Sequence, residues 1–252
     1  MTRDELCEVL DALLCPDEVT DVAPNGLQFE GRPEIRRVAL GVTASLAFLE
    51  RAVAAQADAA IVHHGLFWAD PAGLRIVRSM RRRIGVLCRA DLNLLAYHLP
   101  LDRHPTLGNN AQLAQRLGAS EIEPAFEMGG ATIGVRARLA EPVPLGEIVA
   151  RIARVTAREP LVIPAGPGLV ATVGIVSGDA PKLVAESLAH GDDLFLTGEP
   201  SEPVVHLARE EGIHFVAAGH HATERLGVRA LGAWLEREYD LDCRFIEVGS
   251  PV

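Results

Sequence analysis

The chain has 252 residues, of which 48% are hydrophobic and 23% charged, enough for one large domain or two small ones. This composition is too apolar for a disordered chain, and the sequence has no continuous apolar run long enough to span a membrane. The formal net charge of −10 argues against passive binding to nucleic acid or to an anionic membrane, because both require a basic surface.

Cysteine usage and the opening residues indicate the cellular compartment. Cys7, Cys15, Cys88 and Cys243 lie far apart and form no CxxC pair, so we expect reduced and mostly buried thiols. The opening sequence MTRDELCEVL is polar and lacks the basic and apolar regions of a signal peptide. These features favour a cytoplasmic protein that does not associate with membranes.

The first half of the chain has the pattern of an α/β protein. Thr2 and Glu5 form a T-x-x-E capping box, which predicts an N-terminal helix that ends near Leu14. From residue 37 onward, short apolar runs alternate with segments of helical period, which is typical of a largely parallel α/β sheet. We predict strands at 37–42, 59–62 and 92–97, and helices at 46–57, 71–83 and 109–117.

The segment 124–168 interrupts this alternation. It is rich in Pro and Gly, and we interpret it as a junction or an inserted hairpin-like unit with a strand at 132–139 and a helix at 145–156. The alternation then resumes. We predict strands at 169–176, 193–196, 214–217 and 243–248, and helices at 181–189, 203–211 and 223–236.

Two pairs of glycines suggest an internal duplication. Gly41 and Gly65 are separated by as many residues as Gly174 and Gly198, and each pair encloses a predicted helix and an apolar strand. A duplication predicts two similar α/β lobes with a cleft between them. We place the first lobe at 1–125 and the second at 126–252, including the junction 124–168, with the functional site shared between them.

Six of the nine histidines fall in three short segments, and each segment follows a predicted strand. In open α/β sheets, ligands bind at the carboxyl ends of strands because the loops there leave a crevice. We therefore predict that the three segments converge on one site. They contain His63 and His64, His98 and His104, and His220 and His221.

Two carboxylates accompany these histidines at helical spacing. Asp102 lies four residues after His98, and Glu224 lies four residues after His220. If His220 opens a helix, this spacing places its imidazole and the Glu224 carboxylate on one face. Such a pair has the donor chemistry of a helical metal site.

The adjacent residues His63 and His64 would point to opposite faces of a regular strand, so both reach one site only if the chain turns at Gly65. With them, three imidazoles and two carboxylates are available. That set exceeds the needs of one tetrahedral ion and suits two divalent ions bridged by a carboxylate. The metal is left open among Zn²⁺, Mn²⁺, Fe²⁺, Co²⁺ and Ni²⁺. The candidate metal ligands are His63, His64, Asp102, His220 and Glu224.

Some of these residues also have simpler interpretations. Asp102 can start a turn before Pro105, and Glu224 can be a solvated residue in a first helical turn. His98 is our candidate for proton transfer, since imidazole titrates near neutral pH. No P-loop or GxSxG motif, and no GxGxxG after the first strand, offers a competing chemistry. Roles stay open for Glu199, His104, His221, Asn109 and Asn110.

Five segments resemble the Nif-three-like family, also called GTP cyclohydrolase I type 2 homologs or dinuclear-metal-centre proteins, in its compact bacterial form. The succession of HHG, H-x-x-x-D and GH-x-x-TE is highly specific. Two positions depart from the family: Gly41, where many relatives have Asp, and His221, where relatives often have Tyr. The segments are APNGLQFEG at 23–31, IVHHGLFW at 61–68, AYHLPLDRHPTLGNNAQLA at 96–114, LFLTGEPSE at 194–202 and AAGHHATERLGVRAL at 217–231.

The resemblance implies two intertwined lobes, a toroidal homo-hexamer and a two-metal site in each subunit with the five ligands given above. It also implies GTP ring opening as one reaction, and the same site suits hydrolysis of a phosphoester in a nucleotide or related small molecule. We favour a metal-dependent hydrolase. The alternatives are a non-enzymatic metal-binding or ring-shaped adaptor protein and, with less support, nucleic-acid processing, which would need a basic patch such as the arginines at 81–83.

Overall fold

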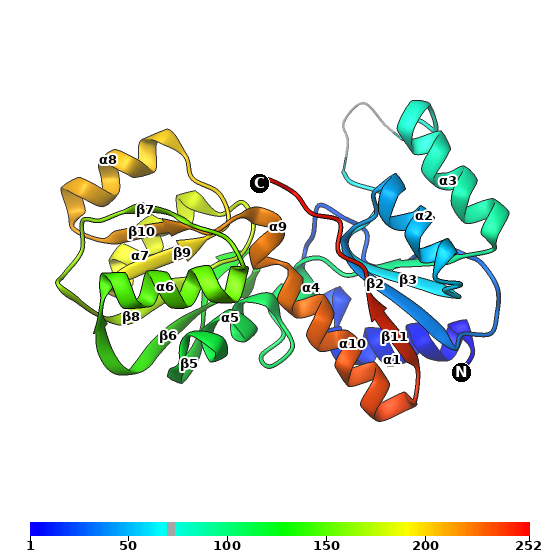
Figure 1. Cartoon of the computed structure of the whole chain (residues 1–252), viewed down its shortest axis with the longest axis horizontal. Helices are drawn as coiled ribbons and strands as arrows, with labels where there is room; N and C mark the ends of the chain where they lie inside the picture. Colours follow the sequence, from blue (N-terminus) through cyan, green and yellow to red (C-terminus); the bar gives the residue numbers. More distant parts are fainter. Residues whose placement is uncertain (70–73) are drawn as a thin grey trace. The chain divides into compact units, whose positions relative to one another are not determined.

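The computed structural model describes residues 1–69 and 74–252, which form a mixed α/β fold with two β-sheets (Figure 1). The chain divides into two compact units, and each sheet belongs to one of them. Unit 1 contains Met1–Leu101 and Val228–Gly249, and unit 2 contains Asp102–Gly227 and Ser250–Val252. The boundary predicted between residues 125 and 126 falls inside a strand of unit 2, and the chain returns to unit 1 near its end.

Unit 1 is built on a five-stranded sheet of order β1-β4-β3-β2-β11. The strands β11, β2, β3 and β4 are parallel, and β1 is an antiparallel edge strand beside β4. The helices α2 and α3 cover one face of this sheet, and α1 and α10 cover the other (Figure 1). The strands are β1 (Gly26–Phe29), β2 (Arg37–Thr43), β3 (Ala59–His64), β4 (Asn93–Ala96) and β11 (Asp242–Phe245). The helices are α1 (Arg3–Leu14), the 3-10 turn η1 (Pro16–Glu18), α2 (Leu46–Ala54) and α3 (Arg78–Ala90).

Gly41 shows why β2 and α2 can pack so closely. A Cβ atom at this position would lie 2.4 Å from the ring of Phe48 on α2. A side chain at position 41 would require Phe48 to shift. Glycine therefore suits the close packing of α2 on β2.

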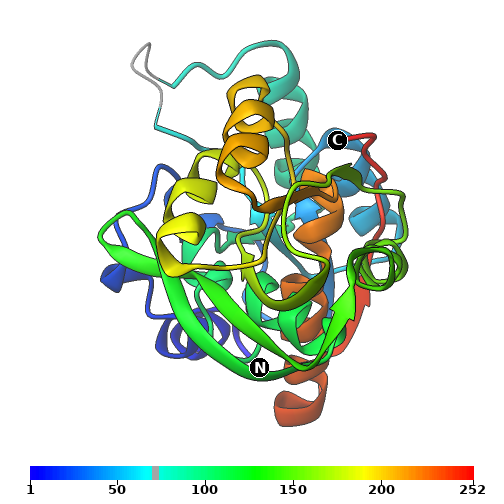
Figure 2. The same ribbon diagram turned by 90° about the vertical axis from the view of Figure 1, so that its left-hand side faces the viewer.

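Unit 2 is built on a six-stranded sheet of order β5-β6-β8-β9-β10-β7. The strands β8, β9 and β10 are parallel, and the long antiparallel pair β5 and β6 extends one side of the sheet (Figure 2). Leu113, Ile148 and Ile152 of α5 and α6 pack against one face, while Ser187 of α7 contacts Gly174 on the other. The strands are β5 (Ala119–Met128), β6 (Ala131–Pro144), β7 (Leu161–Ile163), β8 (Leu169–Ile175), β9 (Leu194–Thr197) and β10 (His214–Ala217). The helices are α5 (Asn109–Leu117), α6 (Leu145–Thr156), the 3-10 turn η2 (Pro181–Leu183), α7 (Val184–His190), α8 (Glu202–Glu211) and α9 (His220–Thr223).

The chain passes between the units three times: within α4 (Leu99–Asp102), within α10 (Arg225–Tyr239), and between Gly249 and Ser250 near its end.

The two sheets contain the same arrangement of four strands. In unit 1 the parallel strands β2, β3 and β4 lie in chain order, and an antiparallel strand that precedes them, β1, lies beside the last. In unit 2 the strands β8, β9, β10 and the preceding strand β7 repeat this arrangement. An internal duplication would leave this pattern, and the duplication itself stays a prediction.

Most predicted elements are present, and the errors have identifiable causes. The helix predicted at 71–83 begins later, at Arg78, and ends at Ala90; residues 71–73 of that prediction lie outside the described part of the chain. The helix predicted at 223–236 is two helices, α9 and α10, which meet at Glu224. The strands β1, β5 and β7 were not predicted. All three are sheet edges, where pairing tolerates the proline of β5 and very short strands.

Two expectations about the whole chain can be compared with the structure. No helix among the described residues combines the length and apolar character needed to cross a membrane. The four cysteines are free thiols, but burial is less than expected: Cys88 is exposed, and the other three are partly exposed.

Candidate metal centre

Three of the predicted site residues of unit 1 form one cluster. His63 and His64 end β3, and His98 follows β4, so all three lie at the carboxyl ends of neighbouring parallel strands. Their ring centroids are 4.7 Å (His63–His64), 5.0 Å (His63–His98) and 5.6 Å (His64–His98) apart. Each offers a ring nitrogen within 4.8 Å of the others, a spacing that can hold a metal ion. His98 is as much a part of this cluster as the two predicted ligands.

The backbone explains how two consecutive histidines share a site. The strand runs through both residues, instead of ending at Val62 as predicted. His63 is fully buried, and its Nδ1–H donates to the carbonyl of Tyr97 at 3.1 Å. His64 is only half-buried, and its Nδ1 is hydrogen-bonded to Thr43 Oγ1 at 3.1 Å. The two rings are thus held by different neighbouring strands.

Gly65, where a turn was expected, also lies against the side chain of Gln28. A Cβ atom at Gly65 would lie 2.2 Å from the Oε1 atom of Gln28. That oxygen accepts the N–H of Leu66 at 2.7 Å, and the Gln28 Nε2 atom donates to the carbonyl of Pro24 at 2.7 Å. Glycine at position 65 therefore leaves room for the Gln28 side chain, which passes close to the chain directly after His64.

Asp21 orients His98, a role that no sequence motif indicated. The Nδ1–H of His98 donates to Asp21 Oδ1 at 2.8 Å, and the side chain of Asp21 is 2% exposed. Asp21 also accepts the N–H of Leu99 and a side-chain bond from Asn25. Burial alone raises the pKa of this carboxyl, but the bonds from His98, Asn25 and Leu99 lower it well below its ordinary value. Asp21 is thus a charged anchor for the imidazole and a poor proton carrier.

In unit 2, Asp102 is held by two buried neighbours. It is 6% exposed, and its Oδ1 atom accepts from Asn109 Nδ2 at 2.8 Å and from Ser177 Oγ at 3.2 Å. The Asn109 Oδ1 atom in turn accepts the N–H of Gly227 at 2.7 Å. Asn109, whose role was open, is therefore an orienting residue for Asp102, and the N-cap position of α5 belongs to Gly108. The simple-turn interpretation of Asp102 does not account for these contacts.

The predicted pair of His220 and Glu224 is adjacent in space. His220 opens α9, and its Nε2 atom lies 3.2 Å from Glu224 Oε2. Glu224 is 3% exposed, so the interpretation as a solvated helical residue is wrong. The Nδ1–H of His220 donates to Glu199, the loop carboxylate whose role was open.

The charges around His220 affect its protonation. Burial by itself lowers the pKa of His220, but the Glu224 carboxylate and then Glu199 raise it to about 9. In this arrangement the imidazole is protonated at neutral pH. Since a metal ligand must be deprotonated, metal binding here displaces a proton.

Glycines follow three strands of unit 2 near His220 and Glu224, and one of them, Gly178, borders the Glu224 carboxylate. Gly178 has φ +70°, and a Cβ atom there would lie 2.3 Å from Glu224 Oε1 and 3.4 Å from His220 Nε2. The carbonyl of Gly178 accepts the N–H of Gly198 at 2.9 Å, and the carbonyl of Gly198 accepts the N–H of Gly219 at 2.9 Å. The loops after β8, β9 and β10 are thus tied together beside the two candidate ligands.

The remaining histidines of the three segments lie in different settings. His104 Nδ1 accepts the N–H of Leu107 at 3.0 Å and holds the turn before α5. Burial lowers the pKa of His104, which suits a neutral acceptor. His221 is half-buried, and its N–H donates to the carbonyl of Val252.

The donor set fits divalent metal ions. In proteins, a metal-binding histidine uses one ring nitrogen while the other bonds to a carboxylate, a carbonyl or another polar group. His63, His64 and His220 each have Nδ1 engaged in this way, so Nε2 is the ring nitrogen with which each could bind a metal. Imidazole and carboxylate donors suit Zn²⁺ and the neighbouring transition metals. The histidine and glutamate clusters can therefore bind metal, with the number and identity of the ions open.

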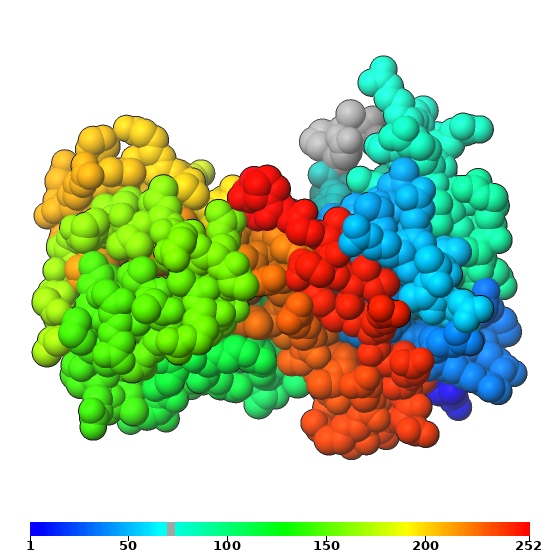
Figure 3. Space-filling view, viewed as in Figure 1, coloured from blue at the N-terminus to red at the C-terminus, as the bar shows by residue number. Residues whose placement is uncertain are grey.

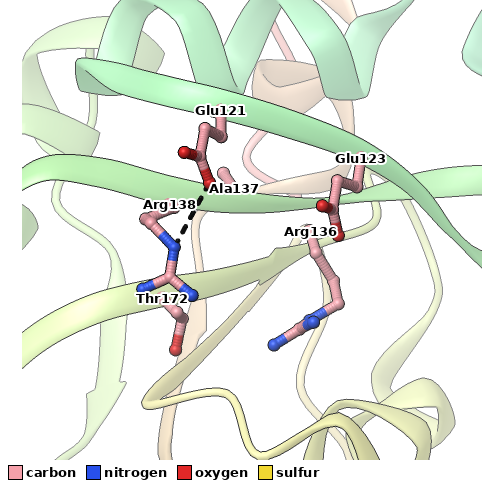
Figure 4. Close-up of a pocket in the computed structure, with 6 residues that line it drawn as sticks. All are labelled: Glu121, Glu123, Arg136, Ala137, Arg138 and Thr172. Carbon is pink, nitrogen blue, oxygen red and sulfur yellow. Dashed lines mark ion pairs between the residues drawn. The ribbon is translucent and has the colours of Figure 1, made fainter.

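A separate pocket lies on the sheet of unit 2, among β5, β6 and β8 (Figure 4). Arg138 Nε pairs with Glu121 at 3.4 Å, and Arg136 Nε pairs with the buried Asp192 at 2.7 Å. None of the predicted site residues lines this pocket. Ion pairs therefore engage Glu121, Arg136 and Arg138, and we assign this pocket no part in the metal site.

The whole chain is similar to known proteins. Residues 1–251 match the family Duf34/NIF3 (NGG1p interacting factor 3). A Haemophilus influenzae protein named GTP cyclohydrolase 1 type 2 homolog is 44% identical over 253 residues, with 100% of both chains covered. The solved structure of protein ybgI, described as of unknown function, has a TM-score of 0.94, 42% identity and 100% coverage of both chains. The protein TTHA1606 from Thermus thermophilus has a TM-score of 0.92 and 38% identity, again with 100% of both chains covered.

Proposed function

Since the chain belongs to the Duf34/NIF3 family, we propose that it binds two divalent metal ions and hydrolyses a nucleotide or a related small molecule. One observation carries the proposal: the candidate ligand histidines have Nδ1 bonded to a protein partner, as in known metal sites. The proposed ligands are His63, His64, Asp102, His220 and Glu224.

The protein's own residues would prepare this site for hydrolysis. Two bound ions would lower the pKa of a water molecule and polarise the bond under attack. Asn109 and Ser177 hold the Asp102 carboxylate, and Glu199 holds the His220 ring. With Nδ1 anchored by Asp21, His98 would take or deliver a proton through Nε2.

Two reactions agree with this proposal. The name of the relatives, GTP cyclohydrolase 1 type 2 homolog, suggests opening of the imidazole ring of GTP. Attack on a phosphoester would use the same water and the same proton carrier. A homo-hexameric ring is part of the proposal, and the solution mass of the protein tests it.

The alternative is a non-enzymatic metal-binding protein or a ring-shaped adaptor. It would use the same ligands, so metal content alone does not separate it from a hydrolase. The separating result is turnover. An adaptor binds metal and a protein partner but hydrolyses neither nucleotides nor phosphoesters.

A nucleic-acid function has one specific observation in its favour, the arginine-rich helix α3. Figure 3 shows the side chains of this helix standing at the surface. Arg81, Arg82 and Arg89, with Glu50, line a cavity of about 430 Å³ beside α2. No ion pair involves these three arginines within the part of the chain that the structure describes. If the protein binds DNA in a salt-dependent way and Arg81→Ala weakens that binding, the nucleic-acid function is favoured over the hydrolase.

The test of the main proposal is the metal content of untagged protein purified without chelator or affinity nickel. We expect about two ions per subunit in the parent, and clearly fewer in the His63→Ala/Glu224→Ala double variant, because each unit then lacks a ligand. His206→Ala removes an exposed histidine of α8 and is the matched control. A parent that holds no metal and takes up none from Mn²⁺, Zn²⁺ or Fe²⁺ would contradict the proposal.

A further inference from the structure

Trp68 is an exposed aromatic side chain beside the histidine cluster of unit 1. Its ring centroid lies 5.3 Å from that of His98, edge to face at 76°, and 5.7 Å from that of His64. It nevertheless stays 43% exposed. Single exposed apolar residues are common on proteins. A tryptophan that contacts two imidazoles of a candidate reaction site and also faces solvent is placed to contact a ligand bound at that site.

Main-chain hydrogen bonds hold the segment that carries this ring. Before it, the N–H of Leu66 donates to Gln28 Oε1 at 2.7 Å. After it, the N–H of Ala69 donates to the carbonyl of Val22 at 2.7 Å. The backbone is therefore held on both sides of Trp68, and its ring contacts His64 and His98, so little conformational freedom is lost when a ligand packs on the ring.

We propose that Trp68 stacks on a planar ring of the substrate, and that the substrate is a purine or another heteroaromatic compound. This inference rests on the proposed function and narrows it. Stacking on an aromatic side chain is favourable for every nucleobase, because each has a π-face. A ring held on Trp68 would lie next to His98, the candidate proton carrier. Of the two proposed reactions, this placement favours ring opening over attack on a simple phosphoester.

The sequence makes the stacking directly measurable, because the chain has two tryptophans. The other, Trp234, packs on Tyr239 within α10 and lies outside the site. In a Trp234→Phe background, the emission of Trp68 is recorded during titration of the Zn²⁺-loaded protein. The probes are guanosine monophosphate and ribose 5-phosphate, which differ by the base. We expect saturable quenching by guanosine monophosphate and none by ribose 5-phosphate.

Calorimetric titration of variants at position 68 measures the contribution of the ring. Trp68→Leu keeps apolar bulk but cannot stack, and we expect its affinity for guanosine monophosphate to fall by about 5- to 150-fold. Trp68→Phe should keep most of the affinity. Binding of ribose 5-phosphate should be the same in all three proteins. The metal content of each variant should equal that of the parent, which excludes loss of the site itself.

The outcomes separate this inference from the proposed function. A parent without metal overturns the proposed function. A metal-loaded parent that binds both probes equally, or binds guanosine monophosphate as tightly after Trp68→Leu, overturns the stacking role alone. Trp68 would then be only a packing contact for His64 and His98.

Discussion

At the scale of single residues, Gly178 controls the position of Glu224. Its positive φ is unfavourable for other residues, and its missing Cβ leaves room for the carboxylate. We predict that Gly178→Ala costs about 1 kcal/mol in backbone strain and also displaces Glu224, so that metal content per subunit falls. Elemental analysis and thermal unfolding measure the two effects.

Gly191 provides the matched control for this prediction. It also has φ +70°, but a Cβ atom there would meet nothing within 4 Å. Gly191→Ala should carry a similar backbone cost and keep the metal content of the parent. Equal metal content in both alanine variants would show that Gly178 does not set the geometry of the ligand.

Asp21 gives a prediction for pH dependence. Its pKa is lowered in the folded protein, so its contribution to stability is present above the unfolded pKa of about 3.9 and is lost as pH falls through the folded value. We predict that Asp21→Asn destabilises the protein by about 1–3 kcal/mol at neutral pH, because buried hydrogen bonds are lost. The difference from the parent should shrink as pH falls below about 4. Denaturant unfolding across this range measures it, and a difference that stays constant with pH would contradict the assignment.

At the scale of elements, α1 is the clearest case of local sequence determining structure. Thr2 Oγ1 accepts the N–H of Glu5 at 3.2 Å, and Glu5 accepts the N–H of Thr2 at 2.7 Å, as the capping box predicts. We predict that Thr2→Ala lowers the free energy of unfolding by about 1 kcal/mol, while Thr2→Ser keeps it. Chemical denaturation measures both. Equal losses in the two variants would mean that the hydroxyl makes no capping contribution.

The helices α5 and α6 were also predicted with their observed bounds, at 109–117 and 145–156. Each has an amphipathic period that packs on one face of the sheet, so local pattern and tertiary packing agree. The start of α3 was wrong. Its first turns are rich in arginine, and no residue of the helix before Leu87 is fully buried, so the apolar period marks its start poorly.

The candidate ligands show how much of the site the spacing of residues in the sequence can predict. The spacing of His220 and Glu224 predicted their contact, because a helical turn brings the fourth residue back to the same face. His63 and His64 were predicted to share one site if the chain turns at Gly65, and their rings do lie close together. Gly65 permits the approach of Gln28, a residue on another strand that the local sequence does not reveal.

At the scale of the whole molecule, chain order and spatial organisation differ. The alternation of apolar runs with segments of helical period predicted an α/β fold. The structure has two sheets, and four strands are arranged in the same way in each. The division into units depends on contacts between residues that are far apart in the chain. The last helix and strand of the chain, α10 and β11, return to unit 1, where β11 pairs with β2. A boundary at 125–126, drawn from a duplication into two successive lobes, does not show this return.

The sequence by itself determined the class of fold, most helices and parallel strands, and a list of residues able to bind metal. It could do so because helix caps, periodicity and ligand chemistry depend on residues near one another in the chain. Only the tertiary structure decided which groups orient those residues. Asp21 on His98, Gln28 beside Gly65 and Asn109 on Asp102 are contacts between different loops and elements. Such partners are chosen by how strands and loops pack, and no local pattern records that choice.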